Sequence, residues 1–355
     1  MVIIEKYNQF EDFTDEYHSS DWVFLHFIGS KNKHPLNDYP LMLYVRTSSD
    51  KEYVLSFGHD ESVELTLDSL INLNNDIPKY VADIKSVYHF TDFNNVIDLQ
   101  QAEFQKQGNL VDNQMFLTTS HRYFHSKGMN NFVVPLMKHI EYCQDLFTNY
   151  KDNIGDEYNE FYTDANKVFS QIERAGLKVS YLDVPSEQKD NVSKDHLMFS
   201  NYNVLTPTGR PSNAYDGLNF AAMNKSDGSR KMIKSRFDEL IEFDFDAYHV
   251  RLIGKLIGYD FGDESVHEHF GKLYNVSYEE SKSMTFKYMY GGVPDDVAKT
   301  HKFFGKVKDY YTKLWTRFKR DKVLLTDIYK RRITLNEKDF YPSKLFNYMI
   351  QSLET

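Results

Sequence analysis

The sequence predicts a mixed α/β protein of the α+β type, in which strands and helices occupy separate stretches of the chain. Three short runs rich in β-forming residues lie close together near the N-terminus, separated by polar or Gly- and Pro-bearing turns. Helical periodicity then dominates the rest of the chain. At 355 residues the chain is long enough for two domains, or for one large domain with an appendage.

Composition narrows the class of protein. The chain holds 26 Tyr and 27 Phe, enough for a sizeable packed core. No apolar run approaches the roughly 18 residues that a membrane span needs, and the first residues turn polar too early for a signal peptide. The single Cys143 excludes an internal disulfide and a cysteine-built zinc site, so we expect a reducing cytoplasm and no membrane partner.

Charge is unevenly distributed along the chain. The formal net charge of −10 argues weakly against a nucleic-acid binder. Residues 299–332, however, hold 12 Lys and Arg against 3 Asp, a local net charge of +9. This stretch is either a basic track for a polyanion or a solvated helix face, and composition leaves both interpretations open.

Local sequence patterns predict the strands and helices along the chain. Strands are expected at 22–28, 41–46 and 52–57, and helices at 62–73, 94–106, 132–150, 159–178 and 294–322. In the helix at 159–178, the spacing predicts an apolar stripe ending at Gly176. That stripe comprises Phe161, Val168, Ile172 and Leu177.

Two short passages carry the candidate chemistry. In residues 241–254 a hydrophobic approach leads to Asp244, and Arg251 follows seven residues later. In residues 282–292, Lys282, Phe286 and Tyr290 recur every four residues and therefore share one helix face. A core helix with an aromatic stripe would require the two rings but not a lysine beside them. Asp244 could equally be a solvated strand end.

Together with the turn Thr208-Gly209-Arg210, which lies 34 residues before Asp244, these passages resemble the ordered motifs of a family A DNA polymerase of the DNA polymerase I-like, phage type. The resemblance implies three regions. Residues 1–158 would form a degenerate ribonuclease H-like exonuclease domain, 159–195 a connecting helix with a reduced or absent thumb, and 196–355 a partial palm-and-fingers polymerase domain. Residues 229–236 resemble the family's next strand.

The exonuclease region is expected to be inactive. In the family the first strand carries two acids that hold metal ions, but residues 25–28 contain no carboxylate. Asp92 and Asp145 are either remnants of later exonuclease motifs or plain surface residues.

The resemblance implies roles for the palm and fingers residues. Asp244, at the end of a buried strand, would hold Mg²⁺ with the Phe245 carbonyl. Lys282 would bind the triphosphate, Phe286 the sugar and base, and Tyr290 the templating position; Asp244, Lys282 and Tyr290 form the expected catalytic set. His249 replaces the family's Glu and either crowds the sugar or is an ordinary strand histidine. His267 is either a phosphate ligand or a surface histidine. The residues expected to contact DNA are Arg210, Arg251, Tyr290, Gly291, Arg331, Arg332, Asn347 and Gln351.

In the family a second catalytic aspartate follows the position of Gln351 by some tens of residues, and the sequence given stops at Thr355. We therefore expect little polymerisation by this polypeptide alone. It is the larger piece of a split enzyme, a truncated product, or a decayed relative. The resemblance implies template-directed DNA synthesis in phage replication, in the host cytoplasm, with Mg²⁺, primer-template DNA, deoxynucleoside triphosphates and, for a split enzyme, a C-terminal fragment. The alternative is a catalytically inactive DNA-binding or replication-accessory protein.

Overall fold

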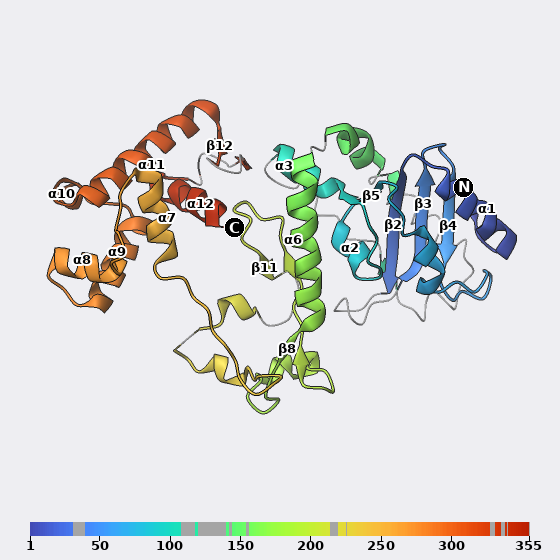
Figure 1. Ribbon diagram of the computed structural model, residues 1–355, viewed down its shortest axis with the longest axis horizontal. Coiled ribbons are helices and arrows are strands. Elements are labelled where there is room, and N and C mark those ends of the chain that lie inside the picture. The colour runs from blue at the N-terminus through green and yellow to red at the C-terminus, as the bar shows by residue number, and fades with distance from the viewer. Residues whose placement is uncertain are drawn as a thin grey trace. The chain divides into compact units, whose positions relative to one another are not determined.

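The structure, a computed structural model, divides into two compact units (Figure 1). Unit 1 comprises Met1–Phe104, Leu110–Val204 and Pro211–Asp238; unit 2 comprises Gln105–Asn109, Leu205–Arg210 and Glu239–Thr355. No described helix is long and apolar enough to cross a membrane. The residues that the structure describes are 1–30, 40–107, 118–119, 140–141, 144–153, 156–213, 219–224, 226–326, 331–334, 338 and 340–354.

Unit 1 is built on a mixed seven-stranded sheet. Its strands run in the order β1-β4-β3-β2-β5-β6, with β7 beside β2. Neighbours β2, β3 and β4 are antiparallel, whereas β5 and β7 run parallel to β2 and β6 runs parallel to β5. The three strands expected from the sequence are confirmed. The strands are β1 (Val2–Ile3), β2 (Val23–Ser30), β3 (Pro40–Thr47), β4 (Glu52–Ser56), β5 (Lys79–Val81), β6 (Val96–Asp98) and β7 (Thr118–Thr119).

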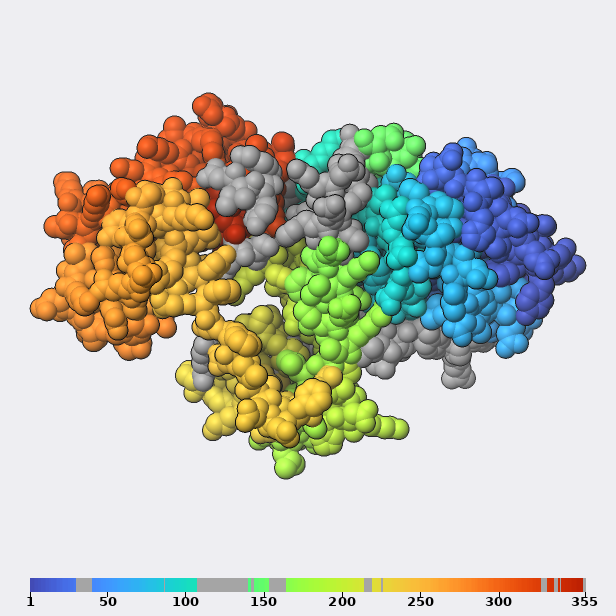
Figure 2. All heavy atoms as spheres, viewed as in Figure 1, coloured from blue at the N-terminus to red at the C-terminus, as the bar shows by residue number. Residues whose placement is uncertain are grey.

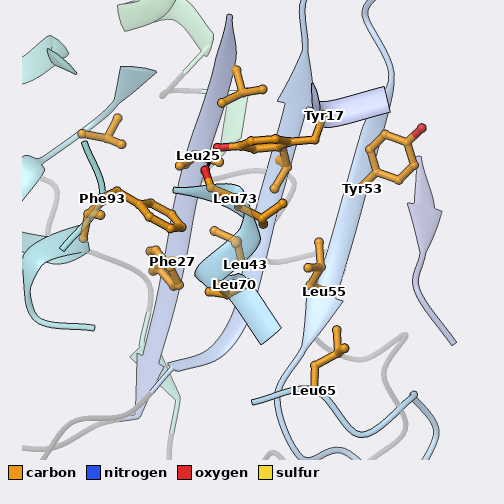
Figure 3. Close-up of a cluster of buried hydrophobic side chains, with 14 of the residues drawn as sticks. Tyr17, Leu25, Phe27, Leu43, Tyr53, Leu55, Leu65, Leu70, Leu73 and Phe93 are labelled. Atoms are coloured by element: carbon orange, nitrogen blue, oxygen red, sulfur yellow. Dashed lines mark hydrogen bonds between the residues drawn. The ribbon is translucent and has the colours of Figure 1, made fainter. Parts of the chain in front are cut away.

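Alternate residues of the central strands build a core on each face of this sheet, because successive side chains of a strand point to opposite faces. On one face Leu25, Phe27 and Leu43 pack under α1 (Tyr7–His18) and the 3-10 helix η2 (Leu67–Leu73), as Figure 3 shows. The Tyr17 hydroxyl donates to the Leu73 carbonyl at 3.0 Å and so links α1 to η2. The other face buries a second cluster that includes Phe24, Ile28, Met42, Tyr44 and Leu99.

Three expected elements of unit 1 need correction, and a fourth lies mostly outside the described residues. The helix expected at 62–73 is a 3-10 helix that begins only at Leu67. The one expected at 94–106 starts as strand β6, because its first residues pair with β5. Residues 229–236 are not a strand but include the 3-10 helix η6. Most of 132–150 lies outside the described residues. The other elements of unit 1 are α2 (Ile84–Tyr88), α3 (Leu99–Gln107), η3 (Lys151–Asn153), α6 (Asp156–Ala175), β8 (Leu177–Lys178), η4 (Ser186–Asn191), β9 (Leu197–Met198), β10 (Tyr202–Asn203), β11 (Ser212–Asn213), η5 (Phe220–Ala222) and η6 (Ser229–Met232).

Helix α6 confirms the helix expected at 159–178 as far as Ala175, and Leu177 and Lys178 form β8. The side chain of Phe161 lies outside the described residues, and from residue 164 onward the helix buries the face opposite to the expected one. Val168 and Ile172 of the expected apolar stripe are about half exposed. The buried residues are Asn166, Ser170 and Glu173. Glu173 is buried because it pairs with Lys85 from α2, so a tertiary ion pair outweighs the apolar periodicity of the helix.

Unit 2 is helical. Its core joins α7, α8, α9 and α11 around Phe270, Phe303 and Phe304. The helix expected at 294–322 is interrupted at His301, whose backbone is extended and whose ring lies edge-on against Tyr274 at 4.8 Å. The elements are α7 (Tyr248–Ile257), α8 (Val266–Tyr274), α9 (Tyr278–Gly291), α10 (Asp295–Thr300), α11 (Lys302–Asp321), β12 (Val323–Leu325), β13 (Arg332–Thr334) and α12 (Pro342–Glu354).

Candidate nucleotide and nucleic-acid site

Helix α9 presents the cation and the two rings on one face. It begins with a capping box in which the Ser277 side chain accepts from the Glu280 N–H, and it ends before Gly292, whose φ of +97° favours glycine. Lys282 is exposed, while Phe286 and Tyr290 are half-buried. The two rings lie parallel, with centroids 5.8 Å apart and an interplanar angle of 6°. The local geometry expected for this helix is therefore present.

His267 on α8 lies beside this face. It is only 3% exposed, so the expectation of a surface histidine is wrong. Its ring centroid lies 6.0 Å from that of Phe286 and 5.5 Å from that of Tyr278. Burial lowers the pKa of His267, and the Lys282 ammonium lowers it further, because both disfavour a second positive charge. Its Nδ1 has no hydrogen-bond partner among the described residues.

His249 contacts the same face from α7. Its Nδ1 is hydrogen-bonded to the Tyr290 hydroxyl, and the two rings are edge-on at 6.2 Å and 72°. His249 is the second residue of a helix, so the interpretation as an ordinary strand histidine is wrong. The structure thus brings together His249, His267, Lys282, Phe286 and Tyr290.

Asp244 does not stand at the end of a buried strand. Residues 239–245 form no strand in the structure, and Phe243 and Phe245 are 90% and 77% exposed. This segment belongs to the chain coloured yellow to orange at the surface in Figure 2. The apolar approach to Asp244 remains uncovered because no described strand pairs with it. Within the described chain no cluster of three or more His, Cys, Asp or Glu could hold a metal ion.

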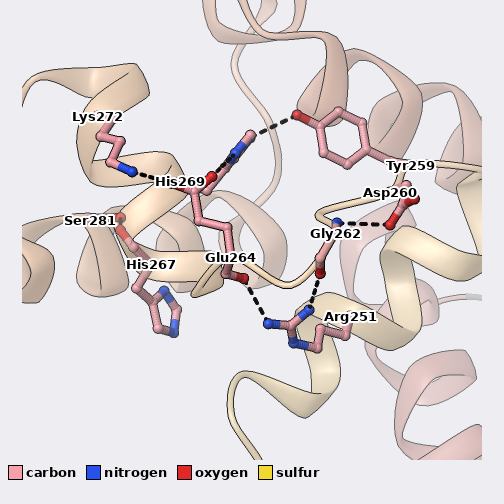
Figure 4. Close-up of polar contacts among 9 residues, drawn as sticks. All are labelled: Arg251, Tyr259, Asp260, Gly262, Glu264, His267, His269, Lys272 and Ser281. Atoms are coloured by element: carbon pink, nitrogen blue, oxygen red, sulfur yellow. Dashed lines mark hydrogen bonds and ion pairs between the residues drawn. The ribbon is translucent and has the colours of Figure 1, made fainter.

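Arg251 stabilises the loop between α7 and α8. Its guanidinium donates to the carbonyls of Gly262 at 3.3 Å and Glu264 at 2.8 Å and pairs with Asp246 at 3.2 Å, contacts that Figure 4 shows in part. The Glu264 carboxylate in turn contacts Lys272 and His269. The expected role of Arg251 in binding DNA therefore competes with a set of structural contacts.

Arg331 holds the Thr208-Gly209 turn. Its side chain is buried and its Nη1 donates to the Thr208 carbonyl. Gly209 has φ +78°, and a Cβ there would lie 1.6 Å from that nitrogen. Arg331 is thus engaged within unit 2, whereas Arg210, the next residue of the turn, and Arg332 on β13 are exposed.

Asn347 and Gln351 lie one turn apart on α12 and share a face, as their spacing predicts. Both are half-buried. The Asn347 Oδ1 is buried without a hydrogen-bond partner in the described part of the chain. The exposed Gly291 lies at the end of α9.

Unit 1 gathers its carboxylates elsewhere than expected. Strand β2 carries no carboxylate, and Asp92 is 87% exposed in a loose 3.8 Å contact with Arg174. Asp145 is also exposed. Two carboxylates were missed, the half-buried Asp83 before α2 and the buried Asp98 at the end of β6. They accept hydrogen bonds from backbone N–H groups at the start of α2, which makes them helix caps.

Comparison with solved structures assigns the fold. The POL domain of Pol1 from M. smegmatis, solved in complex with DNA primer-template and dNTP, superposes with a TM-score of 0.71. The match covers 99% of this chain and 86% of that chain at 12% sequence identity. This chain has the fold of a DNA polymerase domain. No family model and no curated protein matches the sequence. The polymerase fold is therefore recognised through structure.

Two parts of this candidate site could not be found from the sequence. The bond between His249 and Tyr290 joins residues 41 positions apart, and the contact between Arg331 and the Thr208 carbonyl joins residues 123 positions apart. Gly209 carried the available signal for the second contact, since a glycine in a polar turn indicates a left-handed residue or a close approach.

Proposed function

We propose that this chain is the core of a family A, phage-type DNA polymerase that carries out template-directed DNA synthesis on primer-template DNA. The observation that carries the proposal is the helix face of α9, on which an exposed lysine precedes two parallel rings, in a chain with a polymerase fold. Lys282 binds the triphosphate, and Phe286 and Tyr290 stack against the nucleotide and the template base. The superposed M. smegmatis domain was solved with DNA and dNTP, which supports the same ligands here.

The proposal assigns a role to each of the three regions expected from the sequence. Residues 1–158 are an inactive ribonuclease H-like exonuclease domain, supported by three antiparallel strands followed by two parallel ones in the order β4-β3-β2-β5-β6. Residues 159–195 link it to the polymerase, with a reduced thumb. Residues 196–355 form the partial palm and fingers, where Arg210, Arg332, Asn347 and Gln351 face the duplex.

Mg²⁺ fits this site only in part. Asp244 offers one carboxylate and Phe245 one carbonyl oxygen, and the nearby Asp246 is paired with Arg251. Two magnesium ions need several oxygen ligands each, so a further carboxylate must come from outside the described residues. We therefore propose that this chain is the larger part of a split or truncated enzyme and works with a C-terminal fragment. The bound metal would activate the primer hydroxyl and hold the triphosphate.

Nucleotide binding tests the proposal without requiring the second fragment. A dNTP is titrated into the chain bound to primer-template DNA, with Lys282→Ala and, as a control, Lys255→Ala, which removes an exposed lysine of α7. Loss of one phosphate-binding cation should weaken binding by about tenfold or more, while the control should bind normally. Equal affinities of all three proteins for the nucleotide would reject the proposed site.

Primer extension separates the enzyme from a binding protein. Mg²⁺-dependent extension, by the chain alone or with a fragment carrying the second carboxylate, should disappear in Asp244→Ala and persist in Glu242→Ala. The alternative, an inactive DNA-binding accessory protein, predicts salt-sensitive DNA binding that survives Asp244→Ala and no extension with any fragment. The basic residues of 299–332 favour DNA binding under either function.

A further inference from the structure

We propose that His249 is a positioning residue: by holding the Tyr290 hydroxyl, it keeps the stacked rings of α9 in register with the segment that carries Asp244. The inference rests on the proposed function, because it concerns the same site. It adds a role for a residue whose identity alone suggested no contact with Tyr290.

The pair links two helices that share the same packing neighbours. Helices α7 and α9 each pack against α11 and α12. The hydrogen bond between His249 Nδ1 and the Tyr290 hydroxyl joins them directly. It lies at the first turn of α7 and the last turn of α9, where helix ends have fewer internal hydrogen bonds. A tertiary hydrogen bond at these two positions therefore determines how the ends sit against each other.

On the α9 side, the bond fixes the plane of an aromatic surface. A tyrosine ring held at its hydroxyl cannot swing about its side-chain torsions. The Tyr290 ring lies parallel to that of Phe286, and Phe286 in turn packs near His267. Fixing Tyr290 therefore fixes the stacked pair before a base arrives, which reduces the ordering that binding requires.

On the α7 side, the bond reaches the segment that bears Asp244. Helix α7 has no side-chain cap, and Ala247 before it is left-handed, with φ +47°. Residues 239–245 pair with no described strand. The position of Asp244 therefore depends on the first turn of α7, and His249 is in that turn. One hydrogen bond thus connects the candidate metal-binding carboxylate with the candidate nucleotide-binding face.

A double-mutant cycle tests this connection. His249→Leu removes both ring nitrogens at similar bulk, and Tyr290→Phe removes only the hydroxyl. Each should weaken dNTP binding to the DNA-bound chain by about tenfold, and the double variant should be no worse than either single variant, because all three lose the same bond. His249→Asn, which places an amide atom near the position of Nδ1, should restore most of the loss.

Tyr288→Phe provides the matched control. Tyr288 lies on the same helix and packs edge-on against Phe304 at 5.4 Å, away from the proposed pair. Its effect should be small and should add to that of His249→Leu. If the effects of His249→Leu and Tyr290→Phe also add, or if His249→Asn gives no rescue, the positioning role is rejected.

A second measurement detects the pair without any nucleotide. With 3-fluorotyrosine at position 290, the ¹⁹F resonance should shift in His249→Leu, return in His249→Asn and stay unchanged in Tyr288→Phe. An unchanged resonance in His249→Leu overturns the inference. If the unsubstituted protein binds no nucleotide, the proposed function fails and the inference with it. If it binds nucleotide and His249→Leu binds and reacts equally well, the inference alone fails.

Discussion

The two units place their charged groups in opposite ways. In unit 1 the ion pair between Lys85 and Glu173 is buried, and Lys85 Nζ also donates to the Asn201 side chain and the Tyr202 carbonyl. In unit 2 the charged groups of the candidate site, Lys282 and Asp244, are exposed. A buried charge needs partners from its own fold, whereas an exposed charge remains available to a ligand. The difference indicates that unit 1 uses this buried pair to hold its structure, whereas Lys282 and Asp244 of unit 2 remain available to a ligand.

The pKa values of two carboxyl groups in unit 1 depend on burial and on the charges beside them. Although burial alone would raise the pKa of Glu173, the His89 imidazole, 3.6 Å away, and the charge of Lys85 hold that pKa below its usual range. At Asp98, burial and the neighbouring Asp83 carboxylate raise the pKa to about 8. Glu173 is therefore charged at neutral pH, whereas Asp98 is mostly protonated.

The largest effect is expected from breaking the buried pair. Lys85→Met keeps the length of the side chain but leaves Glu173 buried without its cation, which should destabilise unit 1 by about 3–5 kcal/mol. Urea unfolding can be followed by Trp22 fluorescence in a Trp315→Phe background. Lys51→Met, which breaks an exposed pair with Glu16, is the control and should change the free energy of unfolding much less. Equal losses would remove the contrast between buried and exposed charge.

A smaller effect is expected in unit 2, where Arg331 is a buried charge with a structural contact. Gly209→Ala adds a left-handed alanine, at about 1–3 kcal/mol, and also displaces the Arg331 guanidinium. Gly262 shares the positive φ, at +59°, but a Cβ there meets no atom within 4 Å. The loss of stability in Gly262→Ala therefore measures only the cost of the left-handed backbone. Unfolding followed by Trp315 fluorescence in a Trp22→Phe background should show the larger loss for Gly209→Ala. The same loss in both would mean that Arg331 does not constrain the turn.

The smallest effect is the change that Asp83→Asn should make to the pH dependence of stability. Because the folded state holds the Asp98 proton up to about pH 8 and the unfolded chain releases it near pH 4, the stability of unit 1 should fall as pH rises between these values. Asp83→Asn retains an acceptor for the Lys85 N–H but removes the neighbouring charge, so this fall should become shallower. The measurement is the free energy of unfolding from pH 5 to pH 8. An unchanged slope would show that Asp83 and Asp98 do not interact.

The sequence by itself determined the elements whose signal is local. The strands β2 to β4 follow from short apolar runs between turns, and the shared face of Lys282, Phe286 and Tyr290 follows from a repeat of four residues. The end of α6 at Gly176, with φ +63°, was equally predictable from glycine's conformational freedom.

Only the tertiary structure decided which faces are buried and which partners meet. Helix α6 buries polar Glu173 rather than its apolar stripe, because Lys85 lies 88 positions away in the sequence but next to it in the fold. The segment before Asp244 alternates like a strand yet remains unpaired, since pairing depends on a neighbour that its own residues do not specify. His249 reaches Tyr290 for the same reason: such contacts depend on the packing of helices distant in sequence, which local periodicity does not encode.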